Sequence, residues 1–150
     1  MYGLVIDDPR LRFSASHFIV EHEKCEKIHG HNYGVKVELR GNLDKRRMVV
    51  DFREIKDVII GVVNRLDHKL LLPAEKGTVK IREGERQIEV TTPTKFYSIP
   101  KEDYLLLPIK STTAEDLARY IFDEVKKHVP LVTKVYVSET DGSAAFYEEG

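Results

Sequence analysis

Two segments near the start of the chain alternate between apolar and polar side chains, the pattern of a half-buried β-strand. In the first, apolar residues occupy the odd positions from Leu11 to Ala15, and His17 ends the same face. In the second, the odd positions from His29 to Leu39 form one face, whose first two members are histidines. Side chains at i and i+2 leave the same side of a strand, so each predicted strand carries histidine at one end of its apolar face.

These two strands are expected to pair as an antiparallel hairpin across a polar connection, residues 21–27. Such pairing places the end of the first strand opposite the start of the second. The hairpin therefore predicts that His17, His29 and His31 gather at one end of a sheet.

Two later segments have the three-to-four-residue spacing of amphipathic helices. Asp51 is expected to cap the first helix, which ends near Leu66. The second is expected to begin near Thr112 and to stop before Pro130.

Three other stretches are expected to be extended. Residues 48–50 read as a short strand. Residues 78–91 read as a hairpin, followed by a proline-punctuated excursion through Pro93 and Pro100. Near the C-terminus, residues 133–140 alternate and a short closing strand follows. The pattern predicts one α+β domain over residues 1–150, with two main helices on one face of an antiparallel sheet.

Composition narrows the range of functions. The 150 residues include 24 Lys and Arg against 25 Asp and Glu, which lacks the positive bias of a nucleic-acid-binding protein. The longest apolar runs are far shorter than the roughly 20 residues that span a bilayer. The N-terminal segment does not resemble a signal peptide, and a single cysteine cannot form an intramolecular disulfide. We therefore expect a cytoplasmic protein without nucleic-acid or membrane partners.

The histidines are the strongest candidates for chemistry. A lone histidine on an apolar face is usually a hydrogen-bonded core residue. Three neutral imidazoles with one open position, however, form the ligand set of a catalytic Zn²⁺. His17, His29 and His31 are therefore candidate zinc ligands. His22 is expected to be solvated, and His128 to complement a helix dipole.

Three acidic or nucleophilic sites each have a structural and a chemical interpretation. Cys25 lies among charged residues, which disfavours the usual buried cysteine, and a nearby cation or metal favours its thiolate. Glu26 is either an exposed carboxylate or an acid–base group. Asp67 and His68 form either a helix terminus or a proton relay. Adjacent side chains rarely pair directly, which weakens the relay.

Glu139 shares a face with Val135 and Val137, so a carboxylate falls where the alternation calls for an apolar side chain. A buried carboxylate needs a cation or several donors. Its partner is either a Lys or Arg, or a ligand with a planar array of N–H donors, such as a pterin or guanine edge.

Six motifs in order resemble the 6-pyruvoyl-tetrahydropterin synthase / 6-carboxy-tetrahydropterin synthase family. They are F-S-A-S-H at 13–17, C-x-x-x-H-G-H at 25–31, V-V-D-F-R-E-I-K at 49–56, L-D-H at 66–68, T-A-E-D-L-A at 113–118 and S-E-T at 138–140. The resemblance covers nearly the whole chain. It implies the tunnelling fold (T-fold), in which trimers close their sheets into one β-barrel and two barrels often stack as a hexamer.

The resemblance also implies roles for individual residues. His17, His29 and His31 are the implied zinc ligands. Cys25 is the implied catalytic thiol, and Asp67 with His68 its relay.

The implied substrate is 7,8-dihydroneopterin triphosphate. Glu139 is the implied anchor of the pterin ring and Thr113 a further substrate contact, while Lys24 and Lys27 are candidates for the triphosphate. Loss of triphosphate gives the pyruvoyl product. Carbon–carbon cleavage gives the carboxy product used in making deazaguanine nucleosides such as queuosine.

Two alternatives remain open. The motif E-x-x-H-G-H, which begins at Glu26, resembles a subgroup that cleaves the side chain to 6-hydroxymethyl-7,8-dihydropterin, on the way to folate-like cofactors. A non-catalytic pterin- or metal-binding module is the second alternative. The segment from Ala74 to Ile109 is longer than the family core requires, and the sequence assigns it no role.

Overall fold

The computed structural model describes the backbone of residues 1–150 and the side chains of all of them except residue 23. The strands of the larger sheet are β1 (Tyr2–Ile6), β2 (Arg12–His17), β3 (His29–Gly41), β4 (Leu70–Pro73), β8 (Tyr104–Leu107), β9 (Val132–Ser138) and β10 (Ala145–Glu148). A smaller sheet contains β5 (Lys80–Glu83), β6 (Gln87–Thr91) and β7 (Phe96–Pro100). The helices are α1 (Phe52–Leu66), α2 (Ala114–Lys126) and the 3₁₀ turn η1 (Glu23–Glu26).

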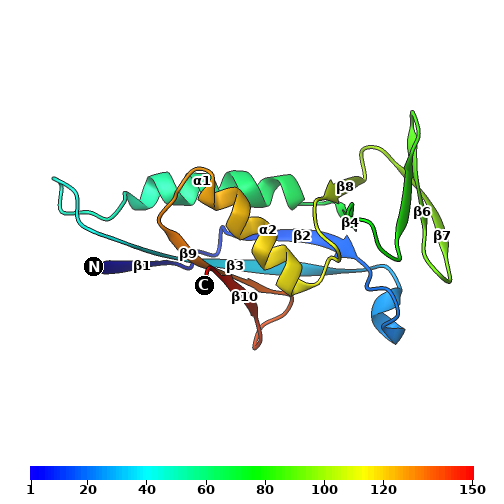
Figure 1. Cartoon of the computed structure of the whole chain (residues 1–150), viewed down its shortest axis with the longest axis horizontal. Helices are drawn as coiled ribbons and strands as arrows, with labels where there is room; N and C mark the ends of the chain where they lie inside the picture. The colour runs from blue at the N-terminus through cyan, green and yellow to red at the C-terminus, as the bar shows by residue number, and fades with distance from the viewer.

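The larger sheet has the order β10-β9-β3-β2-β4-β8, with β1 beside the far end of β3. It is antiparallel across β1, β2, β3, β9 and β10, as predicted. β4 runs parallel to β2, because α1 carries the chain back along the sheet after β3, and β8 runs parallel to β4. Both helices pack on one face of this sheet, which confirms the predicted α+β arrangement (Figure 1).

The first helix begins as expected, where the side chain of Asp51 accepts a hydrogen bond from Arg53 N at 2.7 Å. The second begins one residue later than predicted, with Thr113 rather than Thr112 as its N-cap. Neither helix in the described chain has both the length and the apolar run needed to traverse a bilayer.

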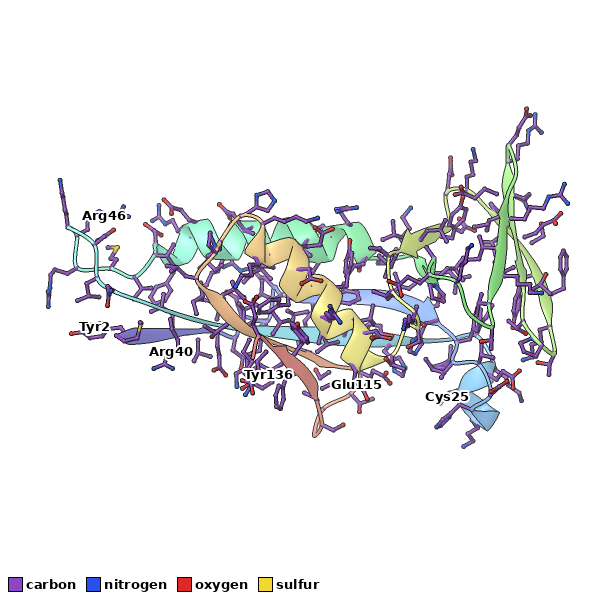
Figure 2. The ribbon with its side chains drawn as sticks, in the orientation of Figure 1. Tyr2, Cys25, Arg40, Arg46, Glu115 and Tyr136 are labelled. Atoms are coloured by element: carbon purple, nitrogen blue, oxygen red, sulfur yellow. The ribbon has the colours of Figure 1, made fainter. Side chains whose placement is uncertain are left out.

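The odd-numbered face of β2 and β3 forms the main core against the helices. Phe13 and Tyr33 stack there with ring centroids 4.7 Å apart, and both are buried. The even-numbered face lies on the other side of the sheet. Figure 2 shows Arg40 and Tyr136 pointing away from α1 on that side. The hydrophobic alternation therefore decides which residues share a face with the histidines.

The smaller sheet occupies most of the segment from Ala74 to Ile109. The predicted hairpin is present as β5 and β6. The proline-punctuated excursion through Pro93 and Pro100 contains a third strand that was not predicted, β7, which pairs with β6.

The strand predicted at residues 48–50 is also wrong. The carboxylate of Asp44 accepts from the backbone N–H groups of Arg46 and Met48, at 2.7 and 3.1 Å, and this holds the chain in a turn.

Candidate active site

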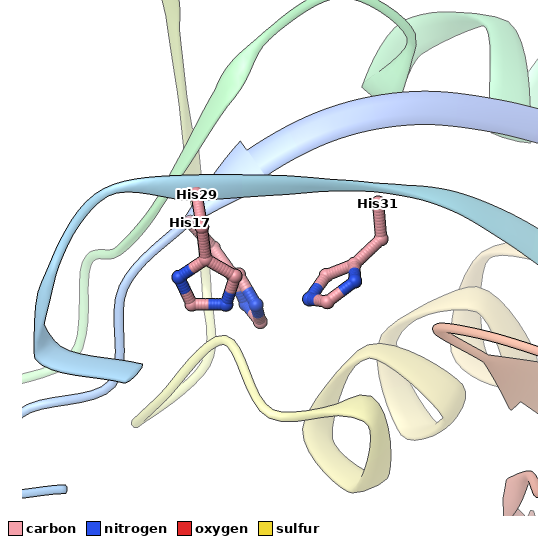
Figure 3. A group of neighbouring side chains, drawn as sticks. All are labelled: His17, His29 and His31. Atoms are coloured by element: carbon pink, nitrogen blue, oxygen red, sulfur yellow. The ribbon is translucent and has the colours of Figure 1, made fainter. Parts of the chain in front are cut away.

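Three imidazoles converge where β2 ends and β3 begins. His17 lies directly opposite His29 in the β2–β3 pair, and Ala15 lies opposite His31. One ligand atom from each histidine lies within 4.8 Å of the other two. In Figure 3, His29 and His31 leave the same side of β3 and their rings point towards the ring of His17. The predicted cluster of His17, His29 and His31 is thus brought together.

Backbone carbonyls hold the outer nitrogens of two rings. Nδ1 of His17 lies 2.7 Å from the carbonyl oxygen of Thr112, and Nδ1 of His29 lies 2.7 Å from that of Lys27. A carbonyl can only accept, so each Nδ1 is the donor and the neutral ring carries its lone pair on Nε2. This is the arrangement by which proteins orient histidines towards a metal.

The inner nitrogens of two of the rings lack hydrogen-bond partners. His17 is 1% exposed, and Nε2 of both His17 and His31 is buried without a hydrogen bond to any described residue. Burial lowers the pKa of His17, which keeps its ring neutral and able to ligate. A buried nitrogen without a hydrogen bond lowers the stability of the fold. Two such nitrogens in neighbouring rings therefore fit a site that binds a cation. The three residues therefore fit Zn²⁺, which favours tetrahedral imidazole ligation with one open position.

Glu139 lies at the rim of this cluster. It follows the last residue of β9, and its Oε2 lies 3.2 Å from His31 Nε2, outside hydrogen-bond geometry. Its side chain is 34% exposed, so the carboxylate is only partly buried. Glu139 also lines a cavity of about 440 Å³ with Val137 and Phe146. The carboxylate thus faces both the imidazoles and a space that a ligand can enter.

Cys25 and Glu26 belong to η1, in the connection between the first and second histidine strands. Ile19 N donates to the carbonyl of Cys25 at 2.7 Å, which folds this connection back on itself. Both residues are half-buried. Cys25 is not part of the cluster of close ligand atoms, and Figure 2 places it at the end of the molecule where the smaller sheet stands. Glu26 accepts a hydrogen bond from Thr94 Oγ1.

Asp67 and His68 do pair directly, contrary to expectation. His68 Nδ1 lies 2.9 Å from Asp67 Oδ2, and Oδ1 accepts from Ser14 N at 2.8 Å. The hydrogen bond from Ser14, aided by His68, lowers the pKa of Asp67. The two side chains can meet because His68 has the left-handed backbone conformation, with φ 61°. This conformation could not be read from residue types.

The Asp67–His68 pair is not part of the group of close imidazoles. His68 lines a cavity of about 580 Å³ with the even-numbered residues Ser14, Ser16 and Asn32, and the odd-numbered His31 also borders this cavity. One chain therefore places His68 on the same cavity as His31 but outside the cluster of three ligand atoms.

Thr113 has a structural task in addition to its expected contact with substrate. Its hydroxyl accepts from Asp116 N at 3.3 Å and from Ser111 Oγ at 3.2 Å, at the start of α2. Its contact with substrate stays a prediction. The carbonyls of Thr112 and Lys27 were missed, because every residue carries a carbonyl and nothing in the sequence marks these two.

The sequence and the fold both match known proteins. Residues 9–150 match the family model described as 6-pyruvoyl tetrahydropterin synthase. A Methanocaldococcus jannaschii protein named putative 6-carboxy-5,6,7,8-tetrahydropterin synthase is 43% identical over 116 residues, covering 77% of this chain and 71% of that protein. The Haemophilus influenzae 6-carboxy-5,6,7,8-tetrahydropterin synthase is 28% identical over 148 residues, covering 91% of this chain and 94% of the relative.

A solved structure superimposes over nearly the whole chain. It is a Plasmodium vivax 6-pyruvoyltetrahydropterin synthase in which a glutamate, described as a catalytic residue, is replaced by alanine. The TM-score is 0.90 at 29% identity, and the match covers 99% of this chain and 98% of the other.

Proposed function

Because the chain belongs to the 6-pyruvoyl tetrahydropterin synthase family and shares its T-fold, we propose that it is a zinc-dependent lyase acting on 7,8-dihydroneopterin triphosphate. The observation that carries the proposal is the cluster of His17, His29 and His31, with two buried nitrogens that lack hydrogen-bond partners. The names of the Methanocaldococcus and Haemophilus relatives favour 6-carboxy-tetrahydropterin as the product over the pyruvoyl compound.

The imidazoles would hold the metal through their inner nitrogens. When bound, zinc supplies a Lewis acid for oxygens of the substrate side chain. The carbonyls of Thr112 and Lys27 keep two of the rings in the ligating tautomer. The protein thus fixes where the substrate side chain lies relative to its proton-transfer groups.

Glu139 would bind the pterin ring. An ionised carboxylate can accept two N–H groups from the planar edge of the ring, and this pairing fixes orientation as well as affinity. Its place at the rim, half open to the adjoining cavity, supports this role. Thr113, at the start of the nearby helix, is proposed as a second contact with the substrate.

Two groups of η1 can move the proton on the first side-chain carbon. Cys25 acts as a thiolate and Glu26 as a carboxylate. His68 would make the second transfer through Nε2, because Asp67 accepts from its Nδ1 and keeps that nitrogen protonated.

The placement of His68 outside the histidine cluster supports an active site shared between copies. β10 and β8 are the outermost strands of the larger sheet, and such edges pair when sheets close into a barrel. We propose that a trimer, alone or stacked as a hexamer, brings His68 of one copy to the histidine cluster of the next. The single unpaired cysteine suits a cytoplasmic location.

A second candidate function is side-chain cleavage to 6-hydroxymethyl-7,8-dihydropterin. It is favoured by one observation, the glutamate described as catalytic in the Plasmodium vivax enzyme, since Glu26 is a glutamate next to Cys25 here. A carboxylate base in place of a thiolate favours retro-aldol cleavage.

Product analysis tests both candidates. The zinc-loaded protein is incubated with 7,8-dihydroneopterin triphosphate, and the pterins are separated and identified. Cys25→Ala and Glu26→Gln are compared with Glu85→Gln, which lies in the exposed turn between β5 and β6. We expect 6-carboxy-tetrahydropterin and a loss of turnover with Cys25→Ala; a hydroxymethyl product that depends on Glu26 supports the second candidate. Absence of any product would leave only a binding module.

A further inference from the structure

The smaller sheet contacts the start of the η1 connection through an apolar cluster. Phe18, directly after the first metal-ligand candidate, stacks on Tyr97 of β7 with ring centroids 5.3 Å apart. Its buried neighbours in the cluster are Leu70, Leu72, Ile88 and Val90. The sheet is therefore fixed to the same strand end that carries His17.

A second contact joins the sheet to the end of η1. Thr94 Oγ1 donates to Glu26 Oε1, and Lys95 Nζ donates to the carbonyl oxygen of Glu26 at 3.5 Å. Thr94 and Lys95 lie in the turn between β6 and β7, and Figure 1 shows this sheet and η1 at the same end of the molecule. The segment of residues 74–109 thus contacts both ends of the connection that carries Cys25 and Glu26.

The turn that presents Thr94 is internally braced. The buried hydroxyl of Thr92 accepts from the backbone N–H of Lys95 at 2.9 Å and of Thr94 at 3.3 Å. Thr92 N donates to the carbonyl of Lys95 at 2.8 Å, and Pro93 has a fixed φ. The braced turn holds the Thr94 hydroxyl in place, so little conformational entropy is lost when this hydroxyl binds Glu26.

We infer that Thr94 is a positioning residue, which holds the Glu26 carboxylate for proton transfer and thereby gives the smaller sheet a part in catalysis. A half-exposed glutamate otherwise populates several rotamers, and misplacement of a reacting group by about 1 Å can lower a rate by about 100-fold. The bond to Oε1 leaves Oε2 for the proton. This inference rests on the proposed function, in which Glu26 is one of the two candidate bases.

The test compares three variants of the full-length, zinc-loaded protein. Thr94→Val removes the hydroxyl at nearly constant shape, Thr94→Ser retains it, and Thr91→Val changes an exposed threonine of β6 as a control. We expect Thr94→Val to lower kcat by about 10-fold to 100-fold, with KM, zinc content and Tm unchanged. Thr94→Ser and Thr91→Val should stay within about twofold of the parent.

A double variant separates positioning from other effects. If Thr94 acts through Glu26, adding Thr94→Val to Glu26→Gln causes no further loss of kcat. An undiminished further loss, or full kcat in Thr94→Val when Glu26→Gln is impaired, overturns the inference and leaves the proposed function intact. Full turnover of Glu26→Gln removes Glu26 as a base and overturns the inference as well, while Cys25 remains to be judged by its own variant.

Discussion

His17 and His29 face each other across the β2–β3 pair, with ring centroids 4.7 Å apart. A slip of the pairing by one residue moves a strand's side chains to the opposite face. The register that buries Phe13 against Tyr33 is therefore the same register that gathers the imidazoles. Folding of the hairpin and formation of the candidate metal site are one event.

The carboxylate at the rim of the cluster should affect substrate binding more than metal binding. We expect Glu139→Gln to lower kcat/KM by about 10-fold to 100-fold, because a hydrogen bond to a charged group contributes about 1.5–3 kcal/mol. Zinc content should stay the same. Steady-state kinetics with metal analysis check this, with Glu102→Gln in an exposed turn as the control. Loss of zinc without a change in KM would instead make Glu139 a metal ligand.

Acid should weaken the fold through Asp67. Its pKa is lowered in the folded state, chiefly by the N–H of Ser14, so its charge stabilises the fold above the unfolded pKa of about 3.9. That stability is lost as the pH falls through the lower folded-state value. Urea unfolding of the parent protein and of Asp67→Asn is measured between pH 3 and 5. The difference between their free energies of unfolding should become smaller below about pH 4. An equal difference at both ends of this range would contradict the account.

The backbone at His68 gives a separate prediction. His68 has a left-handed backbone conformation. A residue other than glycine destabilises the fold by about 1–2 kcal/mol in this region. Glycine avoids this cost, but it loses more conformational entropy on folding, which offsets part of the gain. His68→Gly should therefore be about 1 kcal/mol more stable than His68→Ala, while both lose turnover. Chemical denaturation and activity assays check this pair. Equal stability of the two variants would contradict a left-handed conformation at this position.

The sequence could predict the histidine cluster because alternation reports which face a side chain occupies. The same signal located α1, whose apolar stripe follows Asp51. It failed for β4, because Leu70, Leu71 and Leu72 are all buried and no alternation remains.

Other features depended on single backbone angles or distant contacts. The Asp67–His68 pair needs a positive φ that histidine rarely adopts. Thr94 and Glu26 are 68 residues apart, and no spacing rule connects them. At residues 48–50, local hydrogen bonding by Asp44 overrode the apolar character of the segment.

Zinc analysis tests the central claim most directly. The purified protein and His31→Ala are compared by elemental analysis, with His128→Ala, an exposed histidine beyond α2, as the control. Turnover is then measured after chelation and again after zinc is restored. The account predicts about one zinc ion per chain in the parent and control, its loss in His31→Ala, and turnover that disappears and returns with the metal. Full turnover in protein stripped of metal, or undiminished zinc in His31→Ala, would contradict it.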